Sequence, residues 1–218
     1  MEREHILVIL PHPDDEAFGI SGTLARSIDN GAQVTYACLT LGEMGRNMGV
    51  PIIANRVTLP EIRKKELQES CLAIGIQDVR MMGFHDKTIE FEDQDLLDGV
   101  ILDLIEELRP TLIITFYPGY SVHPDHDATG AAVVRTVGKL PADERPPVHC
   151  LAFSKDCVEK LGEPDIGNDV TSYLDRKLAS VSAHRSQFPN MTFDDSKLDD
   201  EELRKRFGME RFWTYSFS

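Results

Sequence analysis

The stretch ILVILPHPDDE (residues 6–16) joins an apolar run to a proline-flanked turn that carries one histidine and two aspartates. A short, continuous apolar run is typical of a β-strand that is buried on both faces. The polar side chains of His12, Asp14 and Asp15 therefore follow the carboxyl end of a predicted strand. Ligands of open α/β sheets bind beyond the carboxyl ends of the strands. The stretch thus predicts an α/β fold with a polar site at one edge of its sheet.

A second stretch with the same arrangement occurs in the second half of the chain. The apolar residues 112–116 are followed by YSVHPDHD (residues 120–127), which contains His123, Asp125 and His126. Because the carboxyl ends of parallel strands meet at one edge of a sheet, we expect the two polar segments to lie together. Each of them contains the tripeptide His-Pro-Asp. We interpret them as the two halves of one metal site.

The rest of the chain alternates apolar runs with segments of helical periodicity. This alternation predicts a mostly parallel sheet with helices on both faces, a Rossmann-like α/β fold in a single domain over residues 1–218. No GxGxxG follows the first strand and no Walker lysine is present, so dinucleotides and nucleoside triphosphates are not favoured ligands. The predicted strands are residues 6–10, 33–41, 79–84, 111–116, 148–153 and 212–217, the predicted helices are 16–30, 60–74, 93–108, 125–137 or 127–137, 169–187 and 199–207, and residues 42–59 are a predicted loop over the site.

The charge of the chain narrows the class of partner. Its 218 residues include 23 Lys and Arg against 37 Asp and Glu, a formal net charge of -14. Nucleic-acid binding needs a cationic surface, so no nucleic-acid partner is expected, whereas the net charge says little about the substrate. No apolar stretch approaches the roughly 20 residues that span a bilayer, so no membrane association is expected. The charged residues 1–5 do not resemble a secretory signal, which predicts a cytoplasmic protein.

The two polar segments contain suitable ligands for a catalytic metal. A catalytic zinc usually binds three His or carboxylate side chains and keeps one position for water. His12 and Asp15 are three residues apart and are expected to reach one ion, with His126 as the third ligand. In the alternative assignment His123 is the ligand and His126 orients it. Ferrous iron also suits two histidines and one carboxylate.

The remaining polar residues suit proton transfer. Asp14 leaves the backbone in a different direction from Asp15, so its carboxylate is free to act as general base on a water that the metal activates. The alternative role for Asp14 is the N-cap of the following helix. A histidine that is not a ligand, His123, can donate to an oxyanion or to a leaving amine. Asp125 would then orient that histidine.

The strings PHPDDE (residues 11–16) and HPDH (residues 123–126) resemble the LmbE-like, or PIG-L, family of zinc-dependent N-acetylglucosamine deacetylases. The resemblance extends to GTLA at 22–25, TLGE at 40–43, Arg63 with Glu66, and Lys177 with AHRSQ at 183–187, and Ser21 departs from it where the family has glycine. It implies His12, Asp15 and His126 as zinc ligands, Asp14 as general base, and His123, backed by Asp125, as the group that stabilises the oxyanion or protonates the amine. The implied reaction is hydrolysis of an acetamide to acetate and a free amine.

Within this family, chain length and GEMGRN (residues 42–47) look most like the second type of deacetylase in bacillithiol biosynthesis. This resemblance implies N-acetylglucosaminyl malate as substrate and glucosaminyl malate as product. An arginine is expected to pair with the malate carboxylates, because a guanidinium can bind a carboxylate with two hydrogen bonds. The substrate-binding candidates are Arg46, Arg56, Arg63, Tyr120 and His184. Many relatives are oligomers, so a homo-oligomer is a further expectation.

Three other functions remain open at this point. A bacillithiol S-conjugate amidase would keep the metal and hydrolyse a different amide. A metal-dependent phosphoesterase would need more ligands, normally for two ions. A non-catalytic sugar-binding protein would have no use for the free carboxylate of Asp14, so an Asp14→Asn variant separates binder from enzyme.

Overall fold

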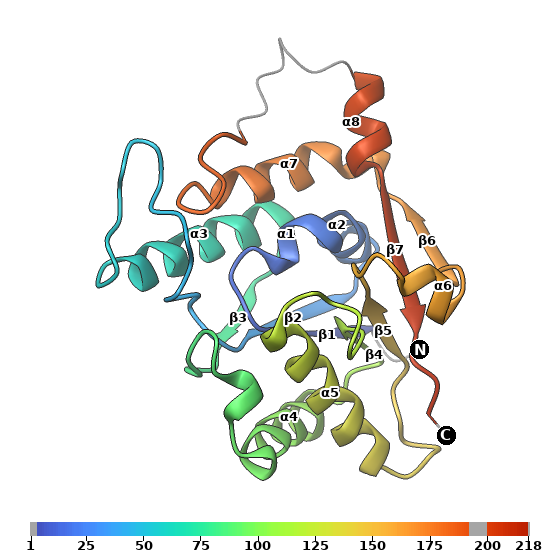
Figure 1. The fold of residues 1–218 in the computed structure, drawn as a ribbon. Helices are drawn as coiled ribbons and strands as arrows, with labels where there is room; N and C mark the ends of the chain where they lie inside the picture. The colour runs from blue at the N-terminus through green and yellow to red at the C-terminus, as the bar shows by residue number, and fades with distance from the viewer. Residues whose placement is uncertain (1–3, 192–199, 218) are drawn as a thin grey trace.

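The sheet places the two polar segments side by side. The computed structural model describes residues 4–191 and 200–217. Its seven strands are arranged in the order β3-β2-β1-β4-β5-β7-β6, with β1 (His5–Leu10) near the middle (Figure 1). The first five are parallel and β7 is antiparallel to both β5 and β6. The remaining strands are β2 (Gln33–Cys38), β3 (Asp78–Met81), β4 (Leu112–Phe116), β5 (Val148–Leu151), β6 (Ile166–Asp169) and β7 (Met209–Thr214).

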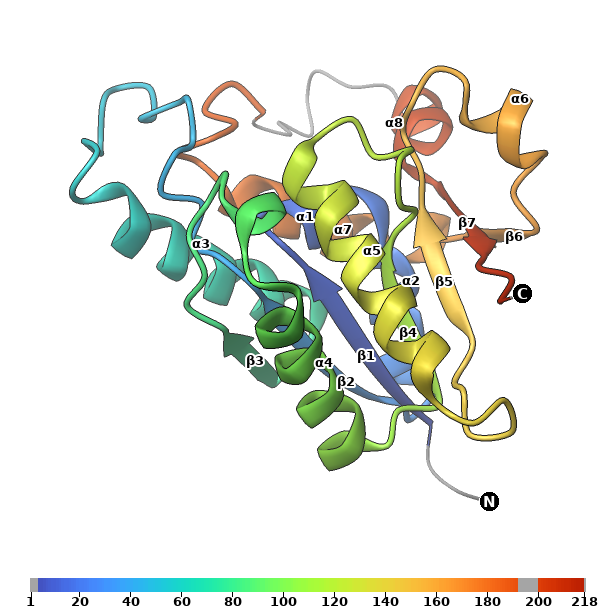
Figure 2. The ribbon, with the colours of Figure 1, turned by 60° about the horizontal axis from the view of Figure 1, so that its bottom comes forward.

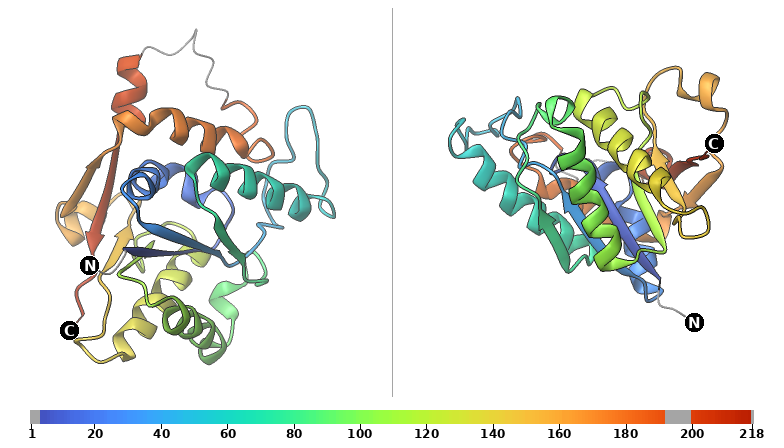
Figure 3. Two further views of the ribbon diagram at one scale, coloured as in Figure 1. Left: turned by 180° about the vertical axis from the view of Figure 1, so that it is seen from behind. Right: turned by 90° about the horizontal axis from the view of Figure 1, so that it is seen from below.

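Helices cover both faces of this sheet, so the predicted α/β fold is confirmed. Along β1, the side chains of Ile6, Val8 and Leu10 pack into one core and those of Leu7 and Ile9 into the other. This is the pattern of a strand buried on both sides. Figures 2 and 3 show the two helical layers on either side of the sheet. One layer contains α1 (Asp15–Gly19), α2 (Ser21–Asp29), α3 (Leu59–Ile74) and α7 (Leu174–Ala183), and the other contains α4 (Gln94–Leu108) and α5 (Pro124–Lys139).

The strand order explains where the site lies. Connections from β1 and β2 run through α2 and α3 on one face, whereas those into and out of β4 run through α4 and α5 on the other. The connections therefore change face between β1 and β4, which is the position where doubly wound sheets bind ligands. The chain after β1 begins with Pro11 and leads directly into α1, and the chain after β4 leads into α5. Both His-Pro-Asp segments follow these two neighbouring strands.

The predicted helix over residues 16–30 is in fact two helices, α1 and α2, separated at Ile20. The backbone φ of Ile20 is -140°, which is not helical. The break exposes the amino end of α2 to Glu210 of β7, whose carboxylate accepts the N–H groups of Gly22 (3.0 Å) and Thr23 (2.7 Å). Lys177 neutralises this buried carboxylate at 2.6 Å. An acidic side chain stabilises a helix amino end, but this one is distant in sequence, so periodicity did not indicate the break.

Several shorter differences concern loops and helix ends. The cap of α5 is His123, whose ring accepts the N–H of Asp125 at 3.2 Å, so neither Asp125 nor Asp127 is the cap. The short elements η1 (Ile89–Phe91), α6 (Cys157–Leu161) and β6 were not predicted, and the helix predicted over 169–187 consists of η2 (Thr171–Tyr173) followed by α7, which ends at Ala183. The loop predicted over residues 42–59 is free of helix and strand until α3 begins at Leu59. The helix predicted over 199–207 is α8 (Asp200–Phe207), and position 199 lies outside the described residues.

No helix in the described part of the chain is both long and apolar enough to cross a membrane.

Candidate metal centre and active site

Three predicted metal ligands converge at the junction of β1 and β4. Nδ1 of His12 lies 3.2 Å from Nε2 of His126 and 3.4 Å from Oδ2 of Asp15. Nε2 of His126 lies 3.1 Å from Oδ1 of Asp15. In a tetrahedral site with metal–ligand bonds near 2.05 Å, neighbouring ligand atoms are about 3.3 Å apart. These two nitrogens and one carboxylate are therefore spaced to hold a divalent cation.

Hydrogen bonds at the outer ring nitrogens support the same assignment. Nε2 of His12 faces Oδ2 of Asp125 (3.1 Å) and Oδ1 of Asp86 (3.2 Å), so it carries a hydrogen. Nδ1 of His126 faces the carbonyl oxygen of Ser121 at 3.1 Å and also carries one. The lone pairs of His12 Nδ1 and His126 Nε2 therefore point to the same place, since metal-bound histidines commonly donate their other N–H to an acceptor.

Two other groups of side chains could also hold an ion, and one of them is His12 with Asp86 and Asp125. The ring nitrogens of His12, His123 and His126 also come within 4.8 Å of one another. Asp15 lies 3.4 Å from His12 Nδ1 and 3.1 Å from His126 Nε2, and its carboxylate is ionised. Burial opposes that charge, but His126 and His12 hold the pKa of Asp15 well below its usual range. An anionic ligand helps neutralise a dication in a buried site.

The carboxylate of Asp125 contacts His12 and not His123, the histidine that it was expected to orient. Its carboxylate is completely buried and accepts His12 Nε2–H, the N–H of Lys87 (2.6 Å) and the N–H of Ile89 (3.3 Å). The prediction that it orients His123 is therefore corrected, because the first turn of α5 directs this side chain beneath His12. Only the backbone N–H of Asp125 contacts His123, at the ring atom Nδ1. The carboxylate fixes a metal ligand instead.

Asp14 stands between the two ligands of the first segment. It occupies the N-cap position of α1 in a left-handed backbone conformation with φ +107°, as the alternative role predicts, but its side chain makes no capping hydrogen bond. Its Oδ2 accepts a hydrogen bond from Nη2 of Arg63 at 2.7 Å. Burial raises the pKa of Asp14 to about 6, against the opposing effect of the Arg63 charge. The carboxyl group is thus held in place and is more basic than usual.

Arg63 itself is held by the turn after β2. Its guanidinium is almost completely buried and donates to the carbonyl oxygens of Gly42 (2.9 Å) and Pro13. A Cβ atom at Gly42 would lie only 1.7 Å from Nη1 of Arg63, and φ of Gly42 is +63°. Only glycine fits this close approach and this backbone conformation. The close approach of Arg63 therefore explains why glycine stands at position 42 of the TLGE string.

The structure separates the predicted substrate-binding residues. Arg46 is exposed and lines the metal cleft, which has a volume of 240 Å³. Arg63 also lines it but is committed to Asp14, and Arg56 donates to the carbonyl oxygens of Glu43 and Gly45 (2.9 Å each). Arg46 is therefore the arginine whose guanidinium is available to a ligand.

The two other candidates, Tyr120 and His184, are not among the residues that line the cleft. Tyr120 packs beside Tyr117 and the cluster around Trp213. His184 is completely buried and bonds to Glu16 at 2.7 Å. A completely buried His184 does not line the pocket, so that prediction is wrong. The predicted pocket role of Tyr120 has no support from the residues that line the cleft.

Sequence reasoning missed Asp86, which lines the cleft. Its Oδ1 lies 3.2 Å from His12 Nε2, and its Oδ2 accepts the N–H of Met44 at 2.8 Å. The N–H of Asp86 donates to Glu43 at 3.1 Å, which ties this residue to the loop after β2. The signal was present in the sequence, because Asp86 follows the predicted strand 79–84 as His12 follows the first strand.

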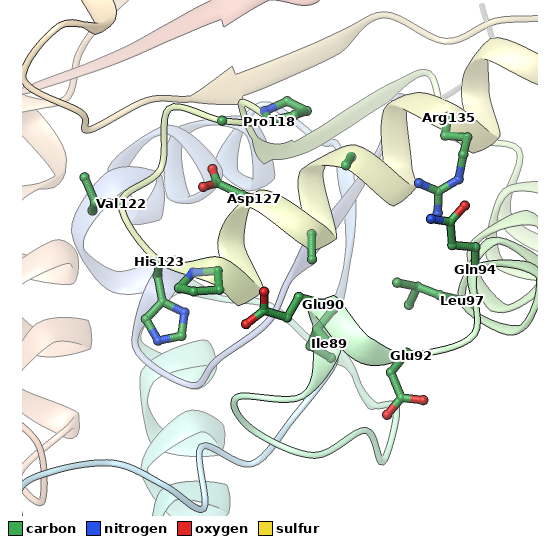
Figure 4. Close-up of a pocket in the computed structure, with 14 residues that line it drawn as sticks. Ile89, Glu90, Glu92, Gln94, Leu97, Pro118, Val122, His123, Asp127 and Arg135 are labelled. Atoms are coloured by element: carbon green, nitrogen blue, oxygen red, sulfur yellow. The ribbon is translucent and has the colours of Figure 1, made fainter.

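A second and larger cavity meets the cleft at His123. This groove has a volume of 740 Å³ and runs between η1, the start of α4 and α5. Figure 4 shows His123 at one end and Gln94 with Arg135 at the other. The guanidinium of Arg135 is bound to Asp98 (3.0 and 2.8 Å), whereas the carboxylate of Glu90 lies beside the groove. Three acidic side chains line the groove, Glu90, Glu92 and Asp127, and the arginine that lines it is paired with Asp98.

The metal-free protein is expected to lose stability as pH rises above about 6.5. Burial opposes protonation of His12 and His126, but Asp125 and Asp15, respectively, outweigh it and raise both pKa values. In the unfolded chain the pKa of a histidine is about 6.5. Between that pH and the raised pKa values of the folded state, the folded protein binds more protons than the unfolded chain. The contribution of these two histidines to the free energy of unfolding is then fully present below pH about 6.5. It is lost as the pH rises through their folded-state pKa values.

Urea unfolding of chelator-treated protein at pH about 6.5 and about 8.5 measures this change. A His126→Asn variant lacks one raised pKa and should show a smaller loss. A metal-free protein that becomes more stable over this interval would contradict the expectation.

Comparison with known proteins agrees with this site. A family model described as PIG-L, GlcNAc-PI de-N-acetylase, matches residues 7–137. A protein of Bacillus cereus named "Probable N-acetyl-alpha-D-glucosaminyl L-malate deacetylase 2" is 51% identical over 220 residues, covering 100% of both chains. A protein of the same name from Bacillus subtilis is 46% identical and covers 99% of each chain.

Solved structures show the same fold. N,N'-diacetylchitobiose deacetylase of Pyrococcus horikoshii superimposes with a TM-score of 0.74 at 24% identity, covering 98% of this chain and 84% of that one. The 4-carboxy-2-hydroxymuconate hydratase GalB of Pseudomonas putida gives a TM-score of 0.75 at 15% identity, covering 99% and 97%. Because a hydratase shares the architecture, the fold alone does not define the reaction. The family match over residues 7–137 and the relatives that align over the whole chain do, and they confirm that this chain belongs to the PIG-L family of de-N-acetylases.

Proposed function

We propose that the protein is a metal-dependent hydrolase that converts N-acetylglucosaminyl malate to glucosaminyl malate and acetate, a step of bacillithiol biosynthesis. The observation that carries the chemistry is the position of Asp14, a carboxyl group with a raised pKa beside three converging ligand atoms. The names of the relatives at 51% and 46% identity support the choice of substrate. We also propose that residues 1–218 form one catalytic domain that works in the cytoplasm.

His12, Asp15 and His126 are the residues that would hold the metal, and Zn²⁺ is the ion we propose, with Fe²⁺ as the alternative. When bound, such an ion supplies Lewis-acid polarisation of the amide carbonyl and a water of lowered pKa. Asp125 and Asp86 keep His12 in the tautomer whose Nδ1 is free. The carbonyl of Ser121 does the same for Nε2 of His126.

Asp14 is the proposed general base. It accepts a proton from the attacking water, and a carboxyl group with a pKa of about 6 holds that proton better than an ordinary aspartate. Arg63 fixes the direction of the carboxylate. The same group can return the proton to the amine that leaves.

His123 is the proposed donor to the developing oxyanion. Its Nδ1 accepts a backbone N–H, so in the neutral ring the hydrogen is on Nε2. Burial, together with neighbouring His12 and His126, lowers the pKa of His123, which keeps the ring neutral near pH 7. Its ring lines both the cleft and the groove. A positioned donor of this kind stabilises charge that appears only in the transition state.

Arg46 is the residue that we propose for the malate carboxylates. An Arg46→Ala variant should raise KM for N-acetylglucosaminyl malate by about 10- to 100-fold, because a charge-assisted hydrogen bond contributes roughly 1.5–3 kcal/mol. KM for N-acetylglucosamine, which has no carboxylate, should change little. Arg56→Ala is the matched control, since Arg56 binds loop carbonyls and should affect both substrates alike. If Arg46→Ala raised KM equally for both substrates, Arg46 would not be the residue that binds the malate carboxylates.

The deciding experiment measures amine release by metal-loaded protein from N-acetylglucosaminyl malate, N-acetylglucosamine and a bacillithiol S-conjugate. Fast release from the malate compound supports the proposal. Preference for the S-conjugate would favour the amidase function, and the 740 Å³ groove beside His123 has room for such a conjugate. No amine from any compound, with metal bound, would overturn the substrate assignment.

We further propose that the protein is a homo-oligomer. Exposed apolar side chains in the loop between β2 and α3, Val50, Ile52 and Val57, support association of subunits. Sedimentation velocity of the metal-loaded protein tests this, and a monomer at micromolar concentration would contradict it.

A further inference from the structure

A buried ion pair lies directly behind Asp14. Glu16 and His184 are both completely inaccessible to solvent, and Nε2 of His184 lies 2.7 Å from Oε1 of Glu16. Ser70 donates to the same oxygen at 2.5 Å. The other oxygen, Oε2, accepts the backbone N–H of Asp14 at 3.0 Å and the hydroxyl of Tyr36 at 3.4 Å. One carboxylate thus connects the end of α7 to the backbone of Asp14.

The backbone of Asp14 needs such a partner. Its φ of +107° is a left-handed conformation that non-glycine residues rarely adopt and that costs conformational energy unless the surroundings enforce it. Arg63 holds the side chain of Asp14, whereas Glu16 accepts its N–H. The residue is therefore held on two sides. Its carbonyl oxygen accepts the N–H of Ala17 at 3.1 Å within α1, and Glu16 is the partner of its N–H.

Within the described part of the chain, the ring of His184 makes no hydrogen bond besides the one to Glu16. Its second ring nitrogen, Nδ1, is buried and has no hydrogen-bond partner among the described residues. A buried charge is costly unless it is paired, so His184 is the group that makes an ionised Glu16 tolerable there. Helix α7, which His184 terminates, packs against α1 and α3.

We infer that Glu16 and His184 are positioning residues that hold the backbone of Asp14 in the conformation needed for proton transfer. The inference rests on the proposed deacetylation and deepens it. Neither residue touches the substrate cleft, so each acts through Asp14. Loss of the pair should lower kcat without changing KM or metal content.

The chain offers a matched control in a second buried ion pair. Lys177 and Glu210 are as deeply buried as Glu16 and His184, lie 2.6 Å apart, and are also anchored on α7. Their carboxylate accepts the N–H groups of Gly22 and Thr23 rather than that of Asp14. A purely structural effect of losing a buried pair should therefore appear equally in both places.

The test compares Glu16→Met with Glu210→Met in the metal-loaded, full-length protein. Both should lower the melting temperature, but only Glu16→Met should lower kcat on N-acetylglucosaminyl malate, by about 100-fold, the cost expected of a misplaced catalytic group. Glu16→Gln keeps one oxygen acceptor and should restore part of kcat. If Glu16→Met does not fold, His184→Gln replaces it with the same expected split. A kcat per folded, metal-loaded molecule that stays at the wild-type level would overturn the inference, as would a fall explained by lost metal.

A second readout does not depend on activity. Hydrogen exchange of the Asp14 amide should become at least about tenfold faster in Glu16→Met and unchanged in Glu210→Met. If wild-type protein hydrolyses none of the substrates, the proposed function fails while this measurement still decides the inference. Unchanged exchange at Asp14 would refute the role of Glu16.

Discussion

An Asp14→Asn variant is expected to lose about 10³-fold or more of kcat while it keeps its metal, because a positioned general base contributes roughly 10²- to 10⁴-fold. An amide cannot accept the proton of the attacking water. It can still occupy the same space and accept a hydrogen bond from Arg63. KM should change little, since the proton moves only in the transition state. The measurement is steady-state amine release together with the metal content of the purified variant.

Asp78→Asn is a suitable control for this variant. Asp78 is a carboxylate paired with Arg80 at the amino-terminal edge of the sheet, remote from the cleft. Its loss should leave kcat unchanged. If Asp14→Asn retained wild-type kcat, Asp14 would not be the base, and the protein would be a binder or would use another group. Loss of metal in Asp14→Asn would instead make Asp14 a ligand.

The position of the site could be predicted because it depends on short-range patterns. His12 and His123 each follow a continuous apolar run, and buried parallel strands end at a common edge. That reasoning needs no knowledge of distant contacts. The family motifs then assigned roles to the residues, and the geometry of His12, Asp15 and His126 supports those roles.

The partners of buried charged groups could not be predicted in the same way. Spacing indicates that Asp125 lies near the site, but the direction of its side chain in the first turn of α5 decides that it contacts His12. His184 looked like a pocket residue because nothing in the sequence places Glu16 beside it. The break at Ile20 likewise depends on Glu210, which comes from the last strand. Each of these contacts joins segments that are distant in sequence.

The same limit applies to the arginines. Three arginines near the site are equivalent by charge and by position along the chain. Arg56 and Arg63 are occupied because the backbone of the turn after β2 presents carbonyl oxygens to them, at Gly45 and Gly42 among others. Only a folded loop creates those acceptors. Arg46 is distinguished by exposure at the cleft, which no sequence pattern indicates.

A His126→Ala variant is expected to lose both bound metal and turnover, whereas His123→Ala should keep its metal and lose about 10²- to 10³-fold of kcat, the usual effect of removing one oxyanion donor. The contrast follows from geometry. His126 Nε2 lies 3.1 Å from Asp15 and 3.2 Å from Nδ1 of His12, so it completes the ligand set, whereas His123 borders the cleft and the groove. Metal content by mass spectrometry and amine release decide between them.

A ligand set of three histidines makes the opposite prediction. If His12, His123 and His126 bound the ion together, His123→Ala would lose the metal and Asp15→Asn would retain it. The two sets differ in charge, because only the first contains an anionic ligand. Three neutral imidazoles would leave a buried dication beside Asp14 and Asp15 without a directly bound negative charge. A carboxylate already ionised 3.1 Å from His126 removes that cost, so Asp15→Asn should release the metal.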